Sequence, residues 1–200
     1  MTALTLLAVF LVGWFAWTLG EYVMHRVVMH AMRGRGIASR EHLNHHADRD
    51  SILEKWALAW SGILIVGTLL GVGVHPVFGI GWVFGYGFYD LQHYRAHKRA
   101  PRTRYQRWLR RHHFHHHFGR PVVNHGVTLP LWDVVFRTYE RPGVIRVPRR
   151  LAMVWLVDQS GRVRTEFAGD YEVVGRADRP ADLAVRDKVD AFANRPPVLV

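Results

Sequence analysis

The 200-residue chain contains no cysteine, so it can form neither a disulfide bond nor a thiolate metal site. Any metal ion would therefore be bound by imidazole and carboxylate groups. Charge is also missing from two long segments, because residues 1–20 and 56–89 contain no Asp, Glu, Lys or Arg. Such uncharged, apolar stretches favour helices that enter a lipid bilayer.

Acidic residues are absent from residues 92–111, which are instead densely basic. The basic residues there are Arg95, Lys98, Arg99, Arg102, Arg104, Arg107, Arg110 and Arg111. A net charge of +11 and a pI near 10.8 are also typical of nucleic-acid-binding proteins. Here the charges lie directly beside apolar segments, so we expect an anionic membrane face and no nucleic acid partner.

The apolar segments predict helices that cross the membrane. We expect one helix over about residues 4–32, which spans the bilayer and projects from it, and no cleavable signal peptide, since no basic segment precedes it. Residues 56–89 exceed the ~20 residues that cross a ~30 Å core. The sequence GVGVHP at 71–76 should break this segment into two crossings, at 56–72 and 76–91. The motifs GTLLG and GWVFG place small residues four apart, which allows helix backbones to approach closely in lipid.

The positions of Lys and Arg predict the orientation. Basic residues occur in the 31–55 loop and after residue 92, whereas the N-terminus and the 71–76 turn have none, so the basic regions should be cytoplasmic. The expected fold is an all-α integral membrane core of three to four membrane helices, with a cytosolic helical cap that carries histidine clusters.

The chain changes character after Pro142. We expect a membrane domain over residues 1–140 and a small soluble α+β appendage over residues 141–200, also cytoplasmic and of undetermined role. Alternating apolar and polar residues at 151–175 predict a β-hairpin around DQSGR, and residues 181–194 predict a helix.

Eleven of the 14 histidines occur in HRVVMH (25–30), HLNHH (42–46), HYRAH (93–97) and HFHHH (113–117), and all of them except His115 are candidate ligands. Residues three or four apart share a helix face, so each cluster can aim two or three imidazoles at one point. His25 and His30 are five apart, about 140° around an ideal helix, and therefore serve two metals or require a bent helix end. Ten ligands are too many for one ion and favour two metals.

Two carboxylates are placed to support these imidazoles. Glu21 lies four residues before His25 and Asp90 three before His93, so each could accept a ring N–H, or else be a solvated interfacial carboxylate. The other four histidines are expected to stay outside the site: His75 structural or solvated, His112 and His115 off the shared face, and His125 an isolated loop residue. Taken alone, HHFHHH could also be an accidental metal-binding tract or a cationic face for phospholipid headgroups.

Five segments in order, EYVMHRVVMH, HLNHH, GFYDLQHYRAH, RRHHFHHHF and GVTLPLWDVVFRTY, resemble the membrane fatty acid hydroxylase and sterol desaturase superfamily, in particular its fatty acid 2-hydroxylase-like branch. The resemblance covers about residues 13–140. It implies a non-haem centre of two iron ions, O₂ as oxidant, and an acyl or other lipid C–H bond as target. The ligands it implies are His25, His30, His42, His45, His46, His93, His97, His113, His116 and His117.

The resemblance also implies partners and leaves alternatives. Without a fused cytochrome b5 domain, electrons should come from a separate donor, ferredoxin-like or cytochrome b5-like, and zinc in purified protein would indicate substitution for iron. Desaturation, or hydroxylation of a carotenoid or sterol, could use the same centre. A histidine-rich metal-handling protein is the alternative from another class, although its ligands should line a path through the membrane instead of gathering at helix ends.

Overall fold

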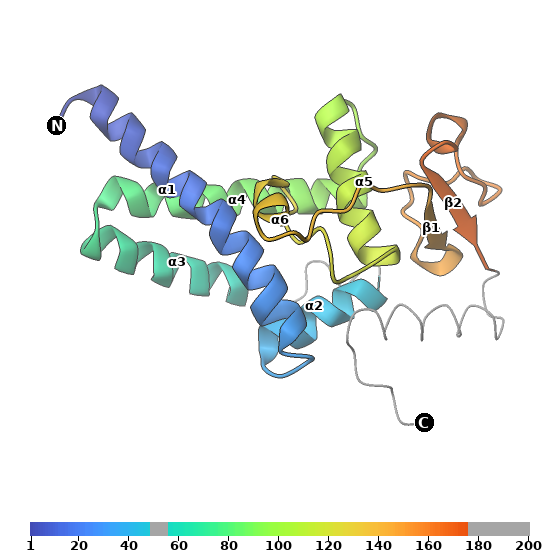
Figure 1. Ribbon diagram of the computed structural model, residues 1–200, viewed down its shortest axis with the longest axis horizontal. Helices are drawn as coiled ribbons and strands as arrows, with labels where there is room; N and C mark the ends of the chain where they lie inside the picture. Colours follow the sequence, from blue (N-terminus) through green and yellow to red (C-terminus); the bar gives the residue numbers. More distant parts are fainter. Residues whose placement is uncertain (49–55, 176–200) are drawn as a thin grey trace.

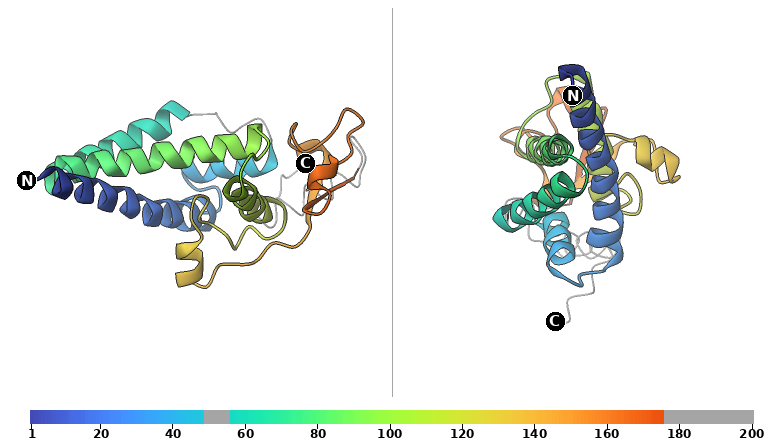
Figure 2. Two further views of the ribbon diagram at one scale, coloured as in Figure 1. Left: turned by 90° about the horizontal axis from the view of Figure 1, so that it is seen from above. Right: turned by 90° about the vertical axis from the view of Figure 1, so that its left-hand side faces the viewer.

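A computed structural model of the chain describes residues 1–48 and 56–175. This part is mostly helical and elongated, with three long helices towards one end and shorter elements at the other (Figures 1 and 2). In chain order the helices are α1 (Ala3–Val23), the π-helix η1 (Met24–Ala31), α2 (Ile37–Ala47), α3 (Trp56–Gly73), α4 (Pro76–Lys98), α5 (Arg104–Phe118), α6 (Leu131–Val135) and the short 3₁₀ helices η3 (Arg149–Leu151) and η4 (Thr165–Phe167).

Helix α1 begins at the N-cap Thr2, whose hydroxyl accepts a hydrogen bond from the Thr5 amide. It continues without interruption into η1, so the predicted long N-terminal helix is confirmed as far as Ala31. Among the described residues, the combined helix Ala3–Ala31 alone is long and apolar enough to cross a membrane. The apolar stretch Ala57–Gly73 in α3 is shorter.

Helices α3 and α4 are separated at the turn that the sequence predicts. His75 is the N-cap of α4, where its Nδ1 accepts a hydrogen bond from the Val77 amide at 3.2 Å. Pro76 follows as the first helical residue, a position that needs no backbone N–H. The expectation of a structural role for His75 is thus confirmed.

Glycines allow α4 to touch its two neighbours through the backbone. A Cβ atom on Gly81 would lie 2.2 Å from the Phe10 carbonyl oxygen of α1, and one on Gly79 would lie 2.3 Å from the Gly67 carbonyl oxygen of α3. No larger residue fits at either distance without moving a helix. The close approach predicted from the small residues is therefore present, and it fixes α1 and α3 against α4 (Figure 2).

The outer faces of these helices are apolar. Large hydrophobic side chains that are exposed there include Leu4, Leu7, Leu11 and Phe15 on α1, Ile65, Leu69 and Val72 on α3, and Ile80 and Phe84 on α4. An exposed apolar surface of this extent is typical of a contact with lipid or another protein.

The tail contains a two-stranded sheet of a different kind from the predicted hairpin. Strand β1 (Ile145–Pro148) pairs in parallel with β2 (Tyr171–Val174), and Ile145 lies opposite Tyr171. The hairpin prediction is wrong except for its turn, which closes with one antiparallel bridge between Val157 and Val163. The residues before the turn pair with no described strand, and Ala152, Met153, Trp155 and Leu156 all pack into one core instead of alternating between a buried and an exposed face. The helix predicted at 181–194 lies outside the described residues.

The described tail shares this core with α4 and α5. Ile145, Val147, Met153, Trp155, Leu156, Phe167 and Tyr171 pack with Ala96, Leu109 and Phe114. The Trp155 indole N–H donates to the Ala96 carbonyl at 3.0 Å, and Arg107 binds Asp170 at 2.6 Å. The tail therefore braces the two helices that carry the HYRAH and HFHHH segments.

Candidate metal centre

Ten histidines form two groups of five, and within each group the ligand nitrogens all lie within 4.8 Å of one another. The first group is His25, His30, His42, His46 and His116; the second is His45, His93, His97, His113 and His117. These are the ten histidines predicted as ligands. Nine of them are buried and His93 is partly buried.

The π-helix η1 explains how His25 and His30 reach the same group. Backbone hydrogen bonds in a π-helix join residues five apart, so two side chains at that spacing are about one turn apart and share a face. The structure places both histidines in one group and does so through a π-helix, which differs from both sequence alternatives, separate metals and a bent helix end.

Helices α2 and α5 each contribute to both groups, which differs from the expectation that each cluster aims at one point. On α2, His42 and His46 face the first group while His45 faces the second. On α5, His113 and His117 face the second group while His116 faces the first. Four residues advance a helix by about 400°, so i and i+4 nearly coincide and the residue between them points elsewhere.

The spacing of the nitrogens suits a cation better than hydrogen bonds. His42 Nε2 lies 2.8 Å from His30 Nε2, 3.0 Å from His46 Nε2 and 3.1 Å from His25 Nε2. A neutral imidazole has a single N–H, so hydrogen bonds cannot satisfy all these close approaches. Two nitrogens bound at right angles to one ion, each at ~2.1 Å, would be about 3 Å apart.

The second group has the same spacing. His45 Nε2 lies 3.1 Å from His93 Nε2, and His97 Nε2 lies 2.8 Å from His113 Nε2. His117 Nε2 is buried and has no hydrogen-bond partner among the described residues. The donor set of each group, five imidazoles with lone pairs directed at one point, fits a divalent transition metal.

Burial keeps these imidazoles in the form that binds metal. It lowers the pKa of His45 from 6.5 to about 3, and burial together with the neighbouring imidazoles lowers the pKa of His42, His46 and His116 well below 6.5. A histidine must be neutral to donate a lone pair. Both groups of histidines can therefore bind metal at neutral pH without first losing protons.

Two backbone carbonyls select the tautomer of ligands in the first group. His25 Nδ1 donates to the His125 carbonyl at 2.6 Å, and His116 Nδ1 donates to the Val123 carbonyl at 2.8 Å. Because a carbonyl can only accept, each Nδ1 carries the proton and Nε2 keeps its lone pair for the centre. The sequence gives no indication of these contacts, since any residue supplies a carbonyl.

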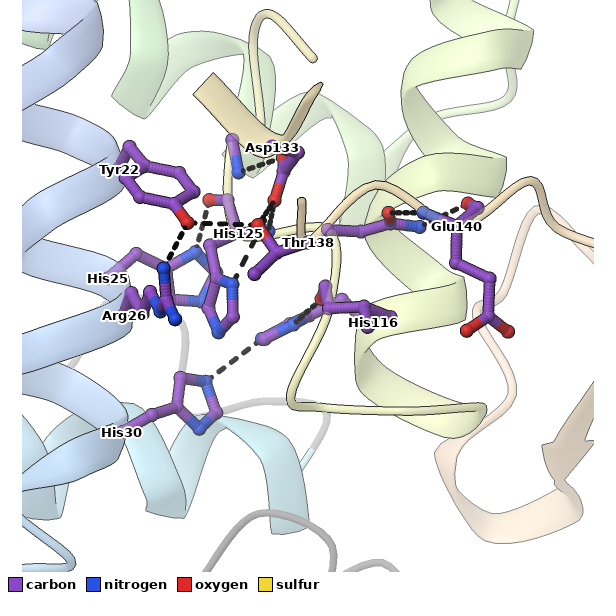
Figure 3. A network of polar contacts seen from close by, with 12 residues as sticks. Tyr22, His25, Arg26, His30, His116, His125, Asp133, Thr138 and Glu140 are labelled. Carbon is purple, nitrogen blue, oxygen red and sulfur yellow. Dashed lines mark hydrogen bonds and ion pairs between the residues drawn. The ribbon is translucent and has the colours of Figure 1, made fainter. Parts of the chain in front are cut away.

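Asp133, at the start of α6, holds the loop that bears these carbonyls (Figure 3). Its carboxylate accepts hydrogen bonds at 2.8 Å from the amides of His125 and Gly126 and from the Thr138 hydroxyl, and lies 3.3 Å from His112 Nε2. Burial alone would raise the pKa of Asp133, but these hydrogen bonds outweigh it and lower the pKa below 3.8. A buried, ionised Asp133 therefore anchors the loop.

The network continues from Asp133 to the surface of η1. The Tyr22 hydroxyl lies 2.9 Å from the Thr138 hydroxyl, and Arg26 donates to the Tyr22 oxygen at 2.7 Å (Figure 3). These contacts tie the loop to the helix that carries His25. Sequence reasoning did not identify this network.

The two carboxylates predicted to support the ligands make other contacts. Glu21 accepts from the Thr128 amide at 2.9 Å and from the Thr128 hydroxyl at 2.7 Å, so the prediction that it binds His25 is wrong. The carbonyl of His125 takes that role, and Thr128 offers Glu21 two donors. Asp90 accepts from the Trp60 indole at 3.3 Å, a contact that the sequence did not predict.

Three further histidines surround the groups. His112 contacts Asp133 and His115 Nε2 lies 3.0 Å from Glu140, so both lie outside the two groups, as predicted. His125 is not isolated, because its buried ring lies 5.2 Å from that of His116 and 5.5 Å from that of His25, between centroids. The expectation for His125 is corrected: it packs against the first group.

Fold and site together define a helical protein in which four segments direct ten imidazoles towards two points suited to metal ions. The family model "Fatty acid hydroxylase" matches residues 10–138, and the chain belongs to this family.

The chain is similar in sequence to several proteins that are named as hydroxylases of fatty acids or ceramides. The chain is 30% identical over 143 residues to the dihydroceramide fatty acyl 2-hydroxylase FAH2 of Arabidopsis thaliana, covering 66% of this chain and 60% of that protein. It is 32% identical over 150 residues to the ceramide very long chain fatty acid hydroxylase SCS7 of Saccharomyces cerevisiae, covering 66% and 38%. The fatty acid 2-hydroxylase of Homo sapiens is 27% identical over 143 residues, covering 64% and 38%.

A solved structure has a similar fold. The structure described as "Full length scs7p (only hydroxylase domain visible)" superposes with a TM-score of 0.58 at 26% identity, covering 70% of this chain and 58% of that one. The matched region spans 60% of the Arabidopsis relative and 38% of the yeast and human relatives.

Proposed function

We propose that the protein is a membrane-bound non-haem di-iron oxygenase that hydroxylates a lipid C–H bond, with a fatty acyl chain as substrate and its 2-position as target. The observation that carries the proposal is the convergence of ten buried or partly buried imidazoles on two points beside an apolar helix. The names of the relatives, hydroxylases of ceramide or fatty acids, support the substrate class.

The two groups of five histidines would hold the two metals, one each. Bound iron supplies the one-electron chemistry that activates O₂, which acid or base catalysis by side chains cannot provide for an unactivated C–H bond. Five imidazoles are one donor fewer than a six-coordinate ion takes. Zinc in the purified protein would be a substitute, because it does not change oxidation state.

The chain's own residues prepare the site in three ways. Burial keeps the imidazoles neutral, the carbonyls of Val123 and His125 fix the tautomers of His116 and His25, and Asp133 holds the loop that supplies them. The balanced reaction converts a C–H bond, O₂, two electrons and two protons into an alcohol and water. The electrons would come from a separate ferredoxin-like or cytochrome b5-like donor.

We propose that α1 with η1, α3 and α4 cross the bilayer, and that the histidine groups and the tail face the cytoplasm. The exposed apolar residues of these helices and the basic segments beyond their ends support this placement. Residues 1–140 would form the hydroxylase domain. Residues 141–200 would form a cytoplasmic extension, whose described part is packed against α5.

The proposal is tested by lipid profiling of aerobic cells that express the full chain, His116→Ala or His115→Ala. His116 belongs to the first group, whereas His115 on the same helix lies outside both and is the matched control. We expect lipids one oxygen atom heavier with the wild type and with His115→Ala, but not with His116→Ala. Lipids two hydrogen atoms lighter would indicate a desaturase. Altered cellular metal content with unchanged lipids would indicate metal handling, and either result would overturn the proposal.

A further inference from the structure

A basic cavity at the corner between α4 and α5 is not used by the metal centre. It has a volume of about 430 Å³ and is lined by Arg95, Arg99, Ala100, Arg102, Gln106 and Arg110. No acidic residue occurs between residues 92 and 111. The size falls within the range of sites for small molecules, ~300–1,000 Å³.

The arginines that line this cavity have no carboxylate partner among the described residues, unlike their neighbours on α5. Arg107 and Arg111 pair with Asp170, and Arg120 pairs with Glu140. Among the residues that the structure describes, Arg95, Arg99 and Arg102 form no ion pair and their guanidinium groups make no hydrogen bond. Three cations left together without a counter-ion attract an anion, and guanidinium matches the geometry of phosphate.

The cavity is held open by Arg110, whose side chain is buried. Its guanidinium donates to the carbonyls of Arg95 at 2.7 Å, of Arg99 at 2.7 Å and of Gln106 at 3.0 Å, which ties the end of α4 to the start of α5. Arg110 thus shapes the corner while the three other arginines remain available to a ligand.

The start of α5 adds favourable electrostatics. Thr103 is its N-cap and Gln106, one of the lining residues, lies in its first turn. The unpaired amides and the positive end of the helix dipole at this terminus favour an anion. The cavity therefore combines guanidinium groups with a helix N-terminus.

We infer that this cavity binds a phosphate group, supplied by an anionic phospholipid at the membrane surface. Arg95 lies six residues, about 9 Å of helix, beyond the last residue of the uncharged segment 56–89, which is the depth of lipid headgroups. The lipid source rests on the proposed membrane placement, whereas the anion site itself rests on the cavity and its unpaired arginines. A concave site of this volume fits one headgroup and not the convex surface of an acidic protein.

The test uses the full-length protein in phosphatidylcholine nanodiscs with and without phosphatidylglycerol, and measures bound lipid by native mass spectrometry. The test variant is Arg99→Gln with Arg102→Gln. The control is Arg33→Gln with Arg35→Gln, which removes the same charge from another basic segment. We expect phosphatidylglycerol to bind about ten-fold more weakly to the first double variant and unchanged to the control.

Inorganic phosphate serves as the soluble probe. If it binds the wild type with the same dependence on Arg99 and Arg102 while phosphatidylglycerol does not, the phosphate site stands and its ligand is soluble. Equal losses of phosphatidylglycerol binding in both double variants would overturn the inference. Metal content is measured in every sample, because its loss from the wild type would count against the metal centre and not against the anion site.

Discussion

The contact between Gly81 and the backbone of α1 gives the sharpest test of how the fold positions the metal centre. A methyl group at residue 81 would stand 2.2 Å from the Phe10 carbonyl oxygen, and ordinary contact begins at about 3.4 Å, so α1 and α4 must separate by roughly 1 Å. Overpacking of this kind costs ~1–3 kcal/mol. We therefore expect Gly81→Ala to unfold at a lower temperature than the wild type.

The same separation should weaken metal binding, because the two helices carry ligands of different groups. Helix α1 leads into η1 with His25 and His30, whereas α4 carries His93 and His97. Metal–ligand distances tolerate only about 0.2 Å, far less than the displacement. Gly81→Ala should bind fewer than two metal ions per chain.

The assay is metal content by mass spectrometry together with thermal unfolding in detergent. The matched control is Gly62→Ala, because a Cβ atom at residue 62 of α3 meets nothing within 4 Å. Alanine there should leave stability unchanged or raise it by ~0.5–1 kcal/mol. If Gly81→Ala retained two metals and the unfolding temperature of Gly62→Ala, the packing argument would be refuted.

Three further predictions concern the ligands and their supports. His45→Ala and His46→Ala change neighbouring residues that belong to different groups, so each should lower metal content from two ions to one, at different sites. Asp133→Asn places amide hydrogens towards the amides of His125 and Gly126 and should cost about 1–3 kcal/mol, measured by thermal unfolding. Since burial lowers the pKa of His45 to about 3, metal should be retained at pH 5, where an exposed histidine with a pKa of 6.5 is mostly protonated.

The metal-free protein, in contrast, should become less stable to unfolding in acid. A histidine whose pKa is lower when folded takes up its proton first in the unfolded chain, so stability falls as the pH drops below 6.5. At pH 5.5 each such histidine costs about 1.4 kcal/mol. An unfolding temperature of metal-free protein that does not change between pH 7 and pH 5.5 would contradict the buried, neutral imidazoles.

Much of the architecture follows from periodicity and charge. The long first helix, the break at His75 and the glycine contacts of α4 follow from apolar length, turn residues and small-residue spacing. The clustering of the histidines and the family resemblance together indicate the ten that converge. Their division into two groups does not follow, because it depends on how α2 and α5 are rotated against each other, which long-range packing decides.

The missed contacts have a common physical origin. The π-helix at His25 and His30, the carbonyls of Val123 and His125, and the anchor at Asp133 all depend on backbone geometry. Every residue has the same backbone groups, so the residue types in a sequence do not show where those groups will lie in the fold. The hairpin prediction for the tail failed because Ala152, Met153, Trp155 and Leu156 are all buried in one core, and because the partner of β1 is the distant strand β2, which local alternation cannot identify.

The central claim is that the two histidine groups together insert oxygen from O₂ into a lipid. Its most direct test supplies isotopically labelled dioxygen to membranes that contain the iron-loaded full chain and an electron donor, followed by mass spectrometry of the acyl chains. We predict one labelled oxygen atom per hydroxylated chain with the wild type, and none with His45→Ala or His46→Ala. Unlabelled hydroxyl groups, or equal labelling in the two variants and the wild type, would contradict the account.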